Sequence, residues 1–335
     1  MSYYNWSVVT VSFLVVLSLS LGGVALTATL HLVGARWQCE VRNLAKSLFA
    51  LFPLAFVLLL VLLAGGSHTF PWLGHLGSDV HMPGWYTMPL LAAREIIGIL
   101  FMGYLCSVYL KRQELAERSE ADRESFHNVA TWIPFFYVLY GTMVSWDFEM
   151  TLMPSWHSAI YGLQNIVSNF GMFLAFLVVW VFFLNASGNL RVNVKSFIPN
   201  YIAQMLFAFT LLWVYTFFAQ YLTIWYGNLP DETDRIYAMQ DGNYTFLWWS
   251  MIFLKFVIPF VTFCFPGPRH SLSAINFVAV CIIIGTLFER FNWVAGMDGK
   301  GTLPLLSFLV VGGTVAIIGY HLVRSSMRKN QLLKV

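Results

Sequence analysis

Charge is scarce in this sequence of 335 residues, of which 10% are charged, whereas 58% are hydrophobic and 17% are aromatic. A soluble domain carries about 25% charged residues, and surface-to-volume scaling limits how much apolar side chain one water-soluble core can bury. The composition therefore excludes a disordered chain, a collagen and a nucleic-acid-binding protein. It predicts an all-α integral membrane protein that crosses the bilayer many times.

Cysteine and histidine patterns that hold redox cofactors are also lacking. The four cysteines form no CxxC, CxxCH or zinc-type spacing. A b-type haem needs two imidazoles at equal depth on facing helices, but only His31, His157 and His321 lie in or at the ends of apolar stretches. We therefore expect this chain to bind no haem, iron–sulfur cluster or metal ion of its own.

Nine stretches are apolar over the length of about 20 residues that a membrane-spanning helix needs. They cover roughly residues 8–30, 45–66, 87–110, 129–147, 157–184, 198–226, 244–265, 271–293 and 303–324. The connections between them are too short to hold an independent core. The sequence thus predicts that residues 1–335 form a single polytopic membrane domain.

Lys and Arg are distributed unevenly over the connections, which predicts an orientation. The first, third, fifth and seventh connections and the C-terminal tail carry fourteen of the 19 basic residues. The other connections carry only Arg235 and Lys300, among acidic residues that include Glu149, Asp231 and Glu232. Basic loops stay in the cytoplasm, so we expect an outward N-terminus and a cytoplasmic C-terminus.

Ionisable residues inside the predicted spans are costly and usually face a bundle interior or a wet cavity. Lys255 lies near mid-depth, one turn before Pro259, and two adjacent pairs lie in the outer thirds of other spans: Arg94 with Glu95, and Glu289 with Arg290. Adjacent residues diverge on a helix, so we expect each charge to find its partner on another helix.

These groups and Asp147, at the outer boundary, admit two interpretations. They form either structural ion pairs that lock helices together, or a proton path or polar pocket that opens outward. In the second case Lys255 would pair with a carboxylate on another helix, such as Glu95, because the kink that Pro259 permits can bring the two helices together. The residues of this hypothesis are Arg94, Glu95, Asp147, Lys255, Glu289 and Arg290.

Two loop segments resemble a known membrane-protein family. The stretch from Ser145 to Gly162, SWDFEMTLMPSWHSAIYG, resembles the family pattern DWxMSLDPHWxSTxYG, and QYLTIWYGNLPDET, from Gln220 to Thr233, resembles IWYGNLPEET. The family is that of the NrfD-like, or polysulfide-reductase-like, membrane subunits of alternative complex III. HLVGARW from His31, then Arg94, then FERF from Phe288 fit the same order.

The resemblance covers residues 24–295 and is strongest to the ActF type of subunit, with the ActC type as the sister possibility. It implies two four-helix bundles plus a flanking helix in a bacterial inner membrane. It also implies a quinol:cytochrome c or quinol:terminal oxidase oxidoreductase, in which an iron–sulfur protein, c-type cytochromes and a sister NrfD-like subunit are partners. The family-motif residues carried over to this chain are His157, Trp225, Tyr226, Asn228, Asp231 and Glu232.

The first motif departs from the family in a way that bears on chemistry. Met153 stands where the family has Asp, and Ser155 stands where it has His, whereas Asp147 remains aligned. The loss of two titratable groups favours a subunit that supports quinol oxidation or conducts protons over one that oxidises quinol itself. No catalytic residue is assigned, and the only small-molecule ligands expected are a quinone or quinol, or a lipid.

Two other classes of protein stay open at this point. A secondary transporter would need inverted repeats with broken helices near mid-depth, and the two halves of this sequence share no motif. A purely structural membrane anchor would tolerate neutralisation of Lys255 and Glu95.

Overall fold

A computed structural model describes residues 3–75, 84–116, 119–191, 194–195 and 197–334. Within these ranges the chain is all-α, and its only β-type pairing is an isolated antiparallel bridge between Leu190 and Leu333. The same ranges contain nine helical segments that are long and apolar enough to cross a membrane. The chain is therefore a multi-pass membrane protein, as its composition predicts.

The nine spans coincide one for one with the nine predicted stretches. Their bounds are Tyr3–Leu32, Val41–Ala64, Met88–Ala116, Arg123–Met150, Tyr161–Ala186, Ile198–Gly227, Thr245–Cys264, Leu272–Ala295 and Leu305–Lys329. The largest differences from prediction, six residues each, are at the polar ends Ala116 and Arg123, where the helices continue past the apolar run. Hydropathy detects the lipid-facing length, whereas the backbone hydrogen bonds extend beyond it.

Five spans are single helices: α1 (Tyr3–Leu32), α4 (Met88–Ala116), α6 (Tyr161–Ala186), α7 (Ile198–Gly227) and α12 (Leu272–Ala295). The others are composite. The second span joins α2 (Gln38–Ser47), η1 (Leu48–Leu51) and α3 (Phe52–Ala64), and the fourth joins α5 (Arg123–Ser145) and η5 (Trp146–Met150). The seventh joins α9 (Thr245–Ile252), η6 (Phe253–Val257) and α10 (Ile258–Cys264). The ninth joins α13 (Leu305–Ser307), η7 (Phe308–Gly312) and α14 (Gly313–Lys329). Short helices in the connections are η2 (Gly66–His68), η3 (Pro71–His75), η4 (Glu120–Asp122), α8 (Pro230–Asp241) and α11 (Pro266–His270).

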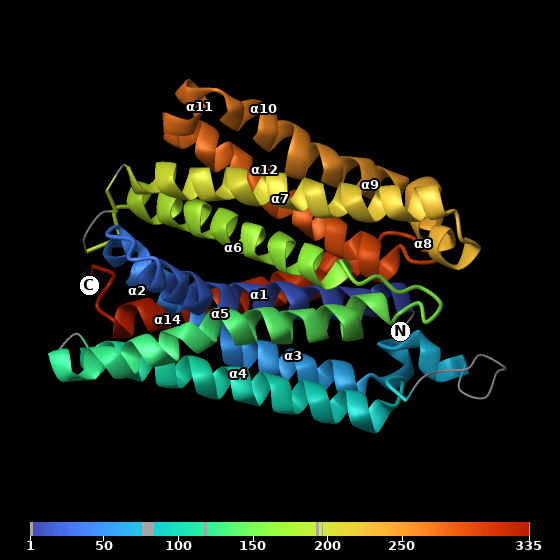
Figure 1. The fold of residues 1–335 in the computed structure, drawn as a ribbon, viewed down its shortest axis with the longest axis horizontal. Helices are drawn as coiled ribbons and strands as arrows, with labels where there is room; N and C mark the ends of the chain where they lie inside the picture. The colour runs from blue at the N-terminus through green and yellow to red at the C-terminus, as the bar shows by residue number, and fades with distance from the viewer. Residues whose placement is uncertain (1–2, 76–83, 117–118, 192–193, 196, 335) are drawn as a thin grey trace.

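The long helices lie roughly side by side, and the two marked ends of the chain lie at opposite ends of the molecule (Figure 1). Helix α8 lies at the end of the molecule near the N-terminus, and α11 lies at the opposite end (Figure 1). An odd number of crossings requires this arrangement.

Helix α1 forms the centre of the molecule and is buried over most of its length, with α3, α5, α6 and α12 packed around it. Its small residues permit this close packing. A Cβ on Gly23 would lie 2.0 Å from the Ala45 carbonyl oxygen, and one on Gly22 would lie 2.5 Å from Cγ of Phe173. Only glycine allows α1 to approach α2 and α6 so closely.

Three spans contain a π-helical stretch of five residues: η5, η6 and η7. A π-bulge inserts one residue into an α-helix and rotates the side chains that follow it, and such bulges are frequent at functional sites. Here η5 carries Asp147 and Glu149, and η6 carries Lys255. The π-turns thus aim three of the buried charges.

Candidate functional site

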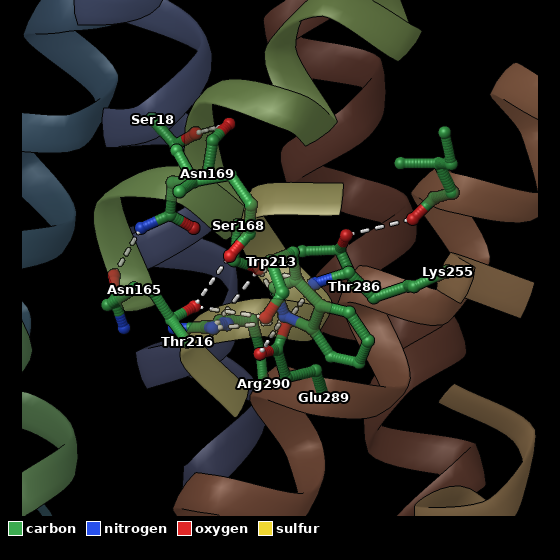
Figure 2. A network of polar contacts seen from close by, with 12 residues as sticks. Ser18, Asn165, Ser168, Asn169, Trp213, Thr216, Lys255, Thr286, Glu289 and Arg290 are labelled. Atoms are coloured by element: carbon green, nitrogen blue, oxygen red, sulfur yellow. Dashed lines mark hydrogen bonds and ion pairs between the residues drawn. The ribbon is translucent and has the colours of Figure 1, made fainter. Parts of the chain in front are cut away.

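Lys255 and Glu289 form a buried ion pair between η6 and α12. The Lys255 ammonium donates to Glu289 Oε2 and also to Ser168 Oγ, at 2.6 Å. It lies 4.4 Å from the centre of the Trp213 indole ring, in a cation–π arrangement. Lys255 is 4% exposed and Glu289 is fully buried, so the pair is removed from bulk solvent (Figure 2).

Both oxygens of the Glu289 carboxylate are used. Ser168 Oγ donates to Oε2 at 2.5 Å, and Trp213 Nε1 donates to Oε1 at 3.0 Å. Helices α6 and α7, which carry these two residues, therefore add two hydrogen bonds to the one that the carboxylate accepts from Lys255. Charged groups removed from water require this degree of hydrogen bonding.

Arg290 extends the charged cluster to a second carboxylate. Its Nη1 donates to both oxygens of Glu149, at 2.6 Å and 2.8 Å, and its Nη2 lies 3.3 Å from Glu289 Oε2. Arg290 and Glu149 are both fully buried. Two cations and two carboxylates thus alternate along one line: Lys255, Glu289, Arg290 and Glu149. We call these four residues the Lys255 cluster.

Two amide side chains continue from Glu149 along α6. Asn165 Nδ2 donates to Glu149 Oε2, and Asn169 Nδ2 donates to Asn165 Oδ1 at 2.5 Å. Ser18 of α1 donates in turn to the Asn169 backbone oxygen at 3.1 Å (Figure 2). The polar contacts of the cluster therefore reach from η6 across α12 and α6 to α1.

A second cluster joins α4 to η5. Arg94 forms a bidentate pair with Asp147, with Nε 2.5 Å from Oδ2 and Nη2 2.6 Å from Oδ1. Trp85 donates from Nε1 to Asp147 Oδ1 at 3.0 Å. The Arg94 guanidinium also lies over the Trp85 indole, with Cζ 3.9 Å from the ring centre. Paired, stacked geometry of this kind is specific to arginine.

Glu95 lies beside this pair and is fully buried. Tyr140 of α5 donates to Glu95 Oε2 at 3.3 Å, and Asp147 interacts electrostatically with the same carboxyl group. Glu95 Oε1 has no hydrogen-bond partner within the described ranges. We call Arg94, Glu95, Tyr140 and Asp147 the Glu95 cluster.

The six predicted site residues therefore separate into two clusters. All are at most slightly exposed, and each has a partner on another helix. The pairing differs from the expected one, because Lys255 contacts Glu289, whereas Glu95 contacts Tyr140. Arg290 also lies near Glu289, its neighbour in sequence, although a helix directs adjacent side chains apart.

Arg235 lies on α8, in the connection between the sixth and seventh spans where it is predicted, and it is fully buried there. It donates to the backbone oxygens of Glu149, Met150 and Trp293, at 2.7, 3.0 and 2.9 Å. It also stacks on the rings of Trp156 and Trp293. Burial lowers the pKa of the Arg235 guanidinium from its ordinary value.

Glu149, also predicted to lie in an outer connection, belongs to the Lys255 cluster, because the fourth helix continues three residues past its predicted end. Ser168, Asn165, Trp213 and Tyr140 were likewise absent from the predicted site. Polar residues of these types are common in membrane spans and carry no individual signal. A basic residue within an otherwise acidic connection was the one available sign that Arg235 is special.

The family-motif residues lie at the end of the molecule that contains α8. His157 is exposed in the loop before α6, and Trp225 and Tyr226 are exposed at the end of α7, Tyr226 by 84%. Asn228 ends α7 in the left-handed conformation, with φ of 47°, and its NH donates to the Ile224 oxygen. Asp231 and Glu232 then occupy the first turn of α8, where their charges suit the helix dipole.

His31, one of the histidines considered for haem, is packed among aromatic rings. Its ring centre lies 4.4 Å from that of Phe126 and 5.6 Å from that of His127. His321 is exposed and packs against Tyr320. These histidines therefore have different surroundings at the end of the molecule where α1 and α14 finish.

An apolar cavity of about 380 Å³ separates the last span from the core. It follows η7 and α14 from Phe308 to Val323, and η1, α1, α6 and α12 form its other walls. At 1.5 Å per residue this length corresponds to roughly 22 Å along the helix. The cavity is thus long, narrow and almost without polar lining.

No protein-family model matches this chain, and no curated protein matches it either.

Proposed function

We propose that this chain is an integral membrane subunit of a quinol-oxidising electron-transfer complex of the alternative complex III type, and that it supports quinol oxidation by conducting protons. The proposal rests on the motif resemblance and, above all, on the buried Lys255 cluster. Four full charges at membrane depth are expensive, and such residues mark ion or proton pathways in membrane proteins by default.

The packing of the helices supports the resemblance. Helices α1, α3, α4 and α5 pack together, as do α6, α7, α9–α10 and α12. In the last span, η7 packs against α1, and α14 packs against α2 and η1. This arrangement is compatible with two four-helix bundles plus a flanking helix. The proposed orientation has the N-terminus in the periplasm of a bacterial inner membrane and the C-terminus in the cytoplasm, as the positive-inside rule requires.

Proton handling in the Lys255 cluster follows from its contacts. Lys255 Nζ and Glu289 Oε2 share one hydrogen bond, so transfer of a proton from Nζ to Oε2 neutralises both groups without a change in net charge. Ser168 Oγ forms a hydrogen bond with each of these two atoms and so keeps them close together. Arg290 stays charged and keeps Glu149 ionised, so the mobile proton belongs to Lys255 and Glu289.

The Glu95 cluster supplies a second place for a proton. Two carboxylates, Glu95 and Asp147, share one cation, Arg94. Since an uncompensated buried charge is strongly unfavourable, the electroneutral form of this cluster holds one proton on the two carboxylates. Asp147 makes both hydrogen bonds with Arg94, so in this proposal Glu95 takes the proton.

Partners would bind at the end of the molecule that carries the family motifs. Exposed Trp225 and Tyr226 beside acidic Asp231 form a surface of the aromatic kind that protein interfaces favour. The partners proposed here are an iron–sulfur protein, c-type cytochromes, the sister NrfD-like subunit and a terminal oxidase. In such a complex the partners supply haem c and iron–sulfur clusters, which carry the electrons.

The apolar cavity beside α14 suits a hydrocarbon chain. Its length and apolar walls match a lipid acyl chain or the isoprenoid tail of a quinol, and no charged residue lines it that could bind a head group. Lipids are therefore the expected small-molecule partners of this chain, together with quinol held at the border with a sister subunit.

Co-purification in a mild detergent tests the proposed function. A complex of this type should contain haem c and iron–sulfur proteins in stoichiometric amount with this chain. A chain that purifies alone and transports a solute in vesicles would be a secondary transporter. A complex that keeps full proton release after neutralisation of Lys255 and Glu95 would reduce the chain to a structural anchor.

A further inference from the structure

A small cavity lies between the two charged clusters, about midway along the spans. It has a volume of about 30 Å³ and is enclosed by α1, α5 and α6. Most of its lining is apolar, including Leu14, Leu17 and Val144, but four side chains carry polar groups: Ser18, Tyr137, Tyr140 and Asn169. Of these, Asn169 belongs to the polar chain of the Lys255 cluster, and Tyr140 belongs to the Glu95 cluster.

The orientation of the Asn169 amide is determined by its neighbours. The ionised Glu149 carboxylate, which binds Arg290, can accept hydrogen bonds but cannot donate them. The Asn165 amide must therefore direct Nδ2 to Glu149 and Oδ1 to Asn169. Asn169 must then donate from Nδ2 to that oxygen. Its own Oδ1 remains buried without a donor within the described ranges.

A buried amide oxygen without a donor is costly, whereas an ordered water supplies the missing bond. On the opposite wall, the Tyr140 hydroxyl donates its proton to Glu95 and still has lone pairs free to accept. A single water needs about 10–15 Å³ of cavity volume and at least two polar partners. The cavity therefore has room for about two waters and partners on both of its sides.

We propose that this cavity is a water-binding site, and that its water joins Asn169 to Tyr140 and so connects the Lys255 cluster with the Glu95 cluster. The water donates to Asn169 Oδ1 and to the Tyr140 hydroxyl. A continuous hydrogen-bonded path then runs from Lys255 to Glu95 across α12, α6 and α5. Tyr140 and Asn169 are positioning residues for this water.

The consequence for proton movement rests on the proposed function. Without the water, the only connection between the two clusters within the described residues is the backbone of η5. With it, the Glu95 proton can reach the water by way of Tyr140, after the Tyr140 hydroxyl turns so that it accepts from Glu95 and donates to the water. Occupancy of the cavity is, however, a property of the folded chain, and it can be tested without any redox reaction.

Radiolytic hydroxyl labelling in ¹⁸O-labelled water tests the water site, because buried aromatic side chains are labelled only beside ordered water. Tyr140 is 5% exposed, and Tyr109, fully buried and distant from the cavity, is the internal control. In the purified wild-type protein Tyr140 should take up ¹⁸O several-fold faster than Tyr109. Equal, slow labelling of both tyrosines would mean a dry cavity and would overturn the proposal.

A cavity-filling variant sharpens this test. A Cβ on Gly141 would lie 3.3 Å from Cγ1 of Ile166, which also lines the cavity, so Gly141→Ala should press Ile166 into the space. Labelling of Tyr140 should fall to the level of Tyr109. Gly313→Ala in α14 adds the same methyl group where nothing lies within 4 Å and should leave labelling unchanged.

The wild-type contrast between Tyr140 and Tyr109 decides the proposal even where Gly141→Ala does not assemble. Fast Tyr140 labelling that Gly141→Ala leaves unchanged in a folded protein would show that the label comes from elsewhere and would also overturn it. Absence of redox partners on co-purification would refute the proposed function alone. The two failures are therefore distinguishable.

Discussion

Asp147 and Glu149 lie two residues apart on the π-helical turn η5 and bind different arginines, Asp147 binding Arg94 on α4 and Glu149 binding Arg290 on α12. Residues two apart on a helix point to nearly opposite sides. One turn at the end of the fourth span therefore anchors both charged clusters, and a change in its pitch would move both. This dependence explains the buried Arg235, whose guanidinium binds the last two carbonyl groups of the turn.

The two carboxylates beside Arg94 should respond differently to neutralisation. Asp147→Asn removes the charge that pairs with Arg94 and leaves a nearly buried cation, a change that costs about 3 kcal/mol or more. Glu95→Gln leaves the Arg94–Asp147 pair intact and keeps an acceptor for Tyr140, so its cost should be near that of one neutral hydrogen bond, about 1 kcal/mol. Thermal unfolding in detergent, followed by tryptophan fluorescence, measures both. Equal loss in the two variants would contradict the assignment of Asp147 as the partner of Arg94.

Arg235 should not be replaceable by lysine. Its planar fork reaches three carbonyl groups and packs against two indole rings, whereas an ammonium group is a compact charge without that shape. Loss of one charge-assisted hydrogen bond costs about 1.5–3 kcal/mol, so Arg235→Lys should lower the unfolding temperature clearly. Arg123→Lys, at an exposed pair with Glu120, is the matched control and should change nothing measurable. A thermally neutral Arg235→Lys would show that charge alone is required.

The orientation can be tested with tags. Epitopes at the N-terminus and within 231–241 should be reachable from the periplasm, and epitopes within 111–124 and at the C-terminus should not, because basic connections stay in the cytoplasm. Protease treatment of intact spheroplasts measures this accessibility. Cleavage within 111–124 would reverse the proposed orientation, whereas lysed spheroplasts provide the control in which every tag is cleaved.

The spans could be predicted from sequence because each is a long apolar run, and the ions inside them could be predicted because they interrupt such runs. Lys255, Glu289 and Arg290 were all found in this way. Their pairing could not be predicted, since it depends on how α12 is rotated against η6. Glu149 and Arg235 were missed for a related reason: they lie beyond the apolar runs and become buried only because η5 extends the fourth helix and α8 folds over Trp156 and Trp293.

The purified subunit should have no haem absorption in the visible region. The cysteines lack any haem-attachment spacing, and His31 is packed against Phe126 and His127. Spectra of the reduced and oxidised chain, separated from its partners, measure this directly. A b-type signal that disappears in His31→Ala or His321→Ala would contradict the proposal that the electrons travel on partner subunits.

Lys255→Met separates a proton path from a structural ion pair. The substitution removes the ammonium group that bonds to Glu289 but leaves Arg290 at 3.3 Å, Ser168 and Trp213 to hold the carboxylate. Because Glu289 keeps a cation and two hydrogen bonds, the complex should still assemble. Proton release in vesicles during quinol oxidation should nevertheless fall, because no group replaces Nζ as the donor to Glu289 Oε2.

The double variant Lys255→Met with Glu289→Gln is the matched control for this experiment. It removes the whole pair, so its stability should be close to that of Lys255→Met or better, as is common when a buried ion pair is replaced by uncharged residues of similar volume. Its proton release should be as low as that of the single variant. If both variants assemble and release protons at the wild-type rate and stoichiometry, then Lys255 and Glu289 serve only to lock η6 to α12, and the path must run elsewhere.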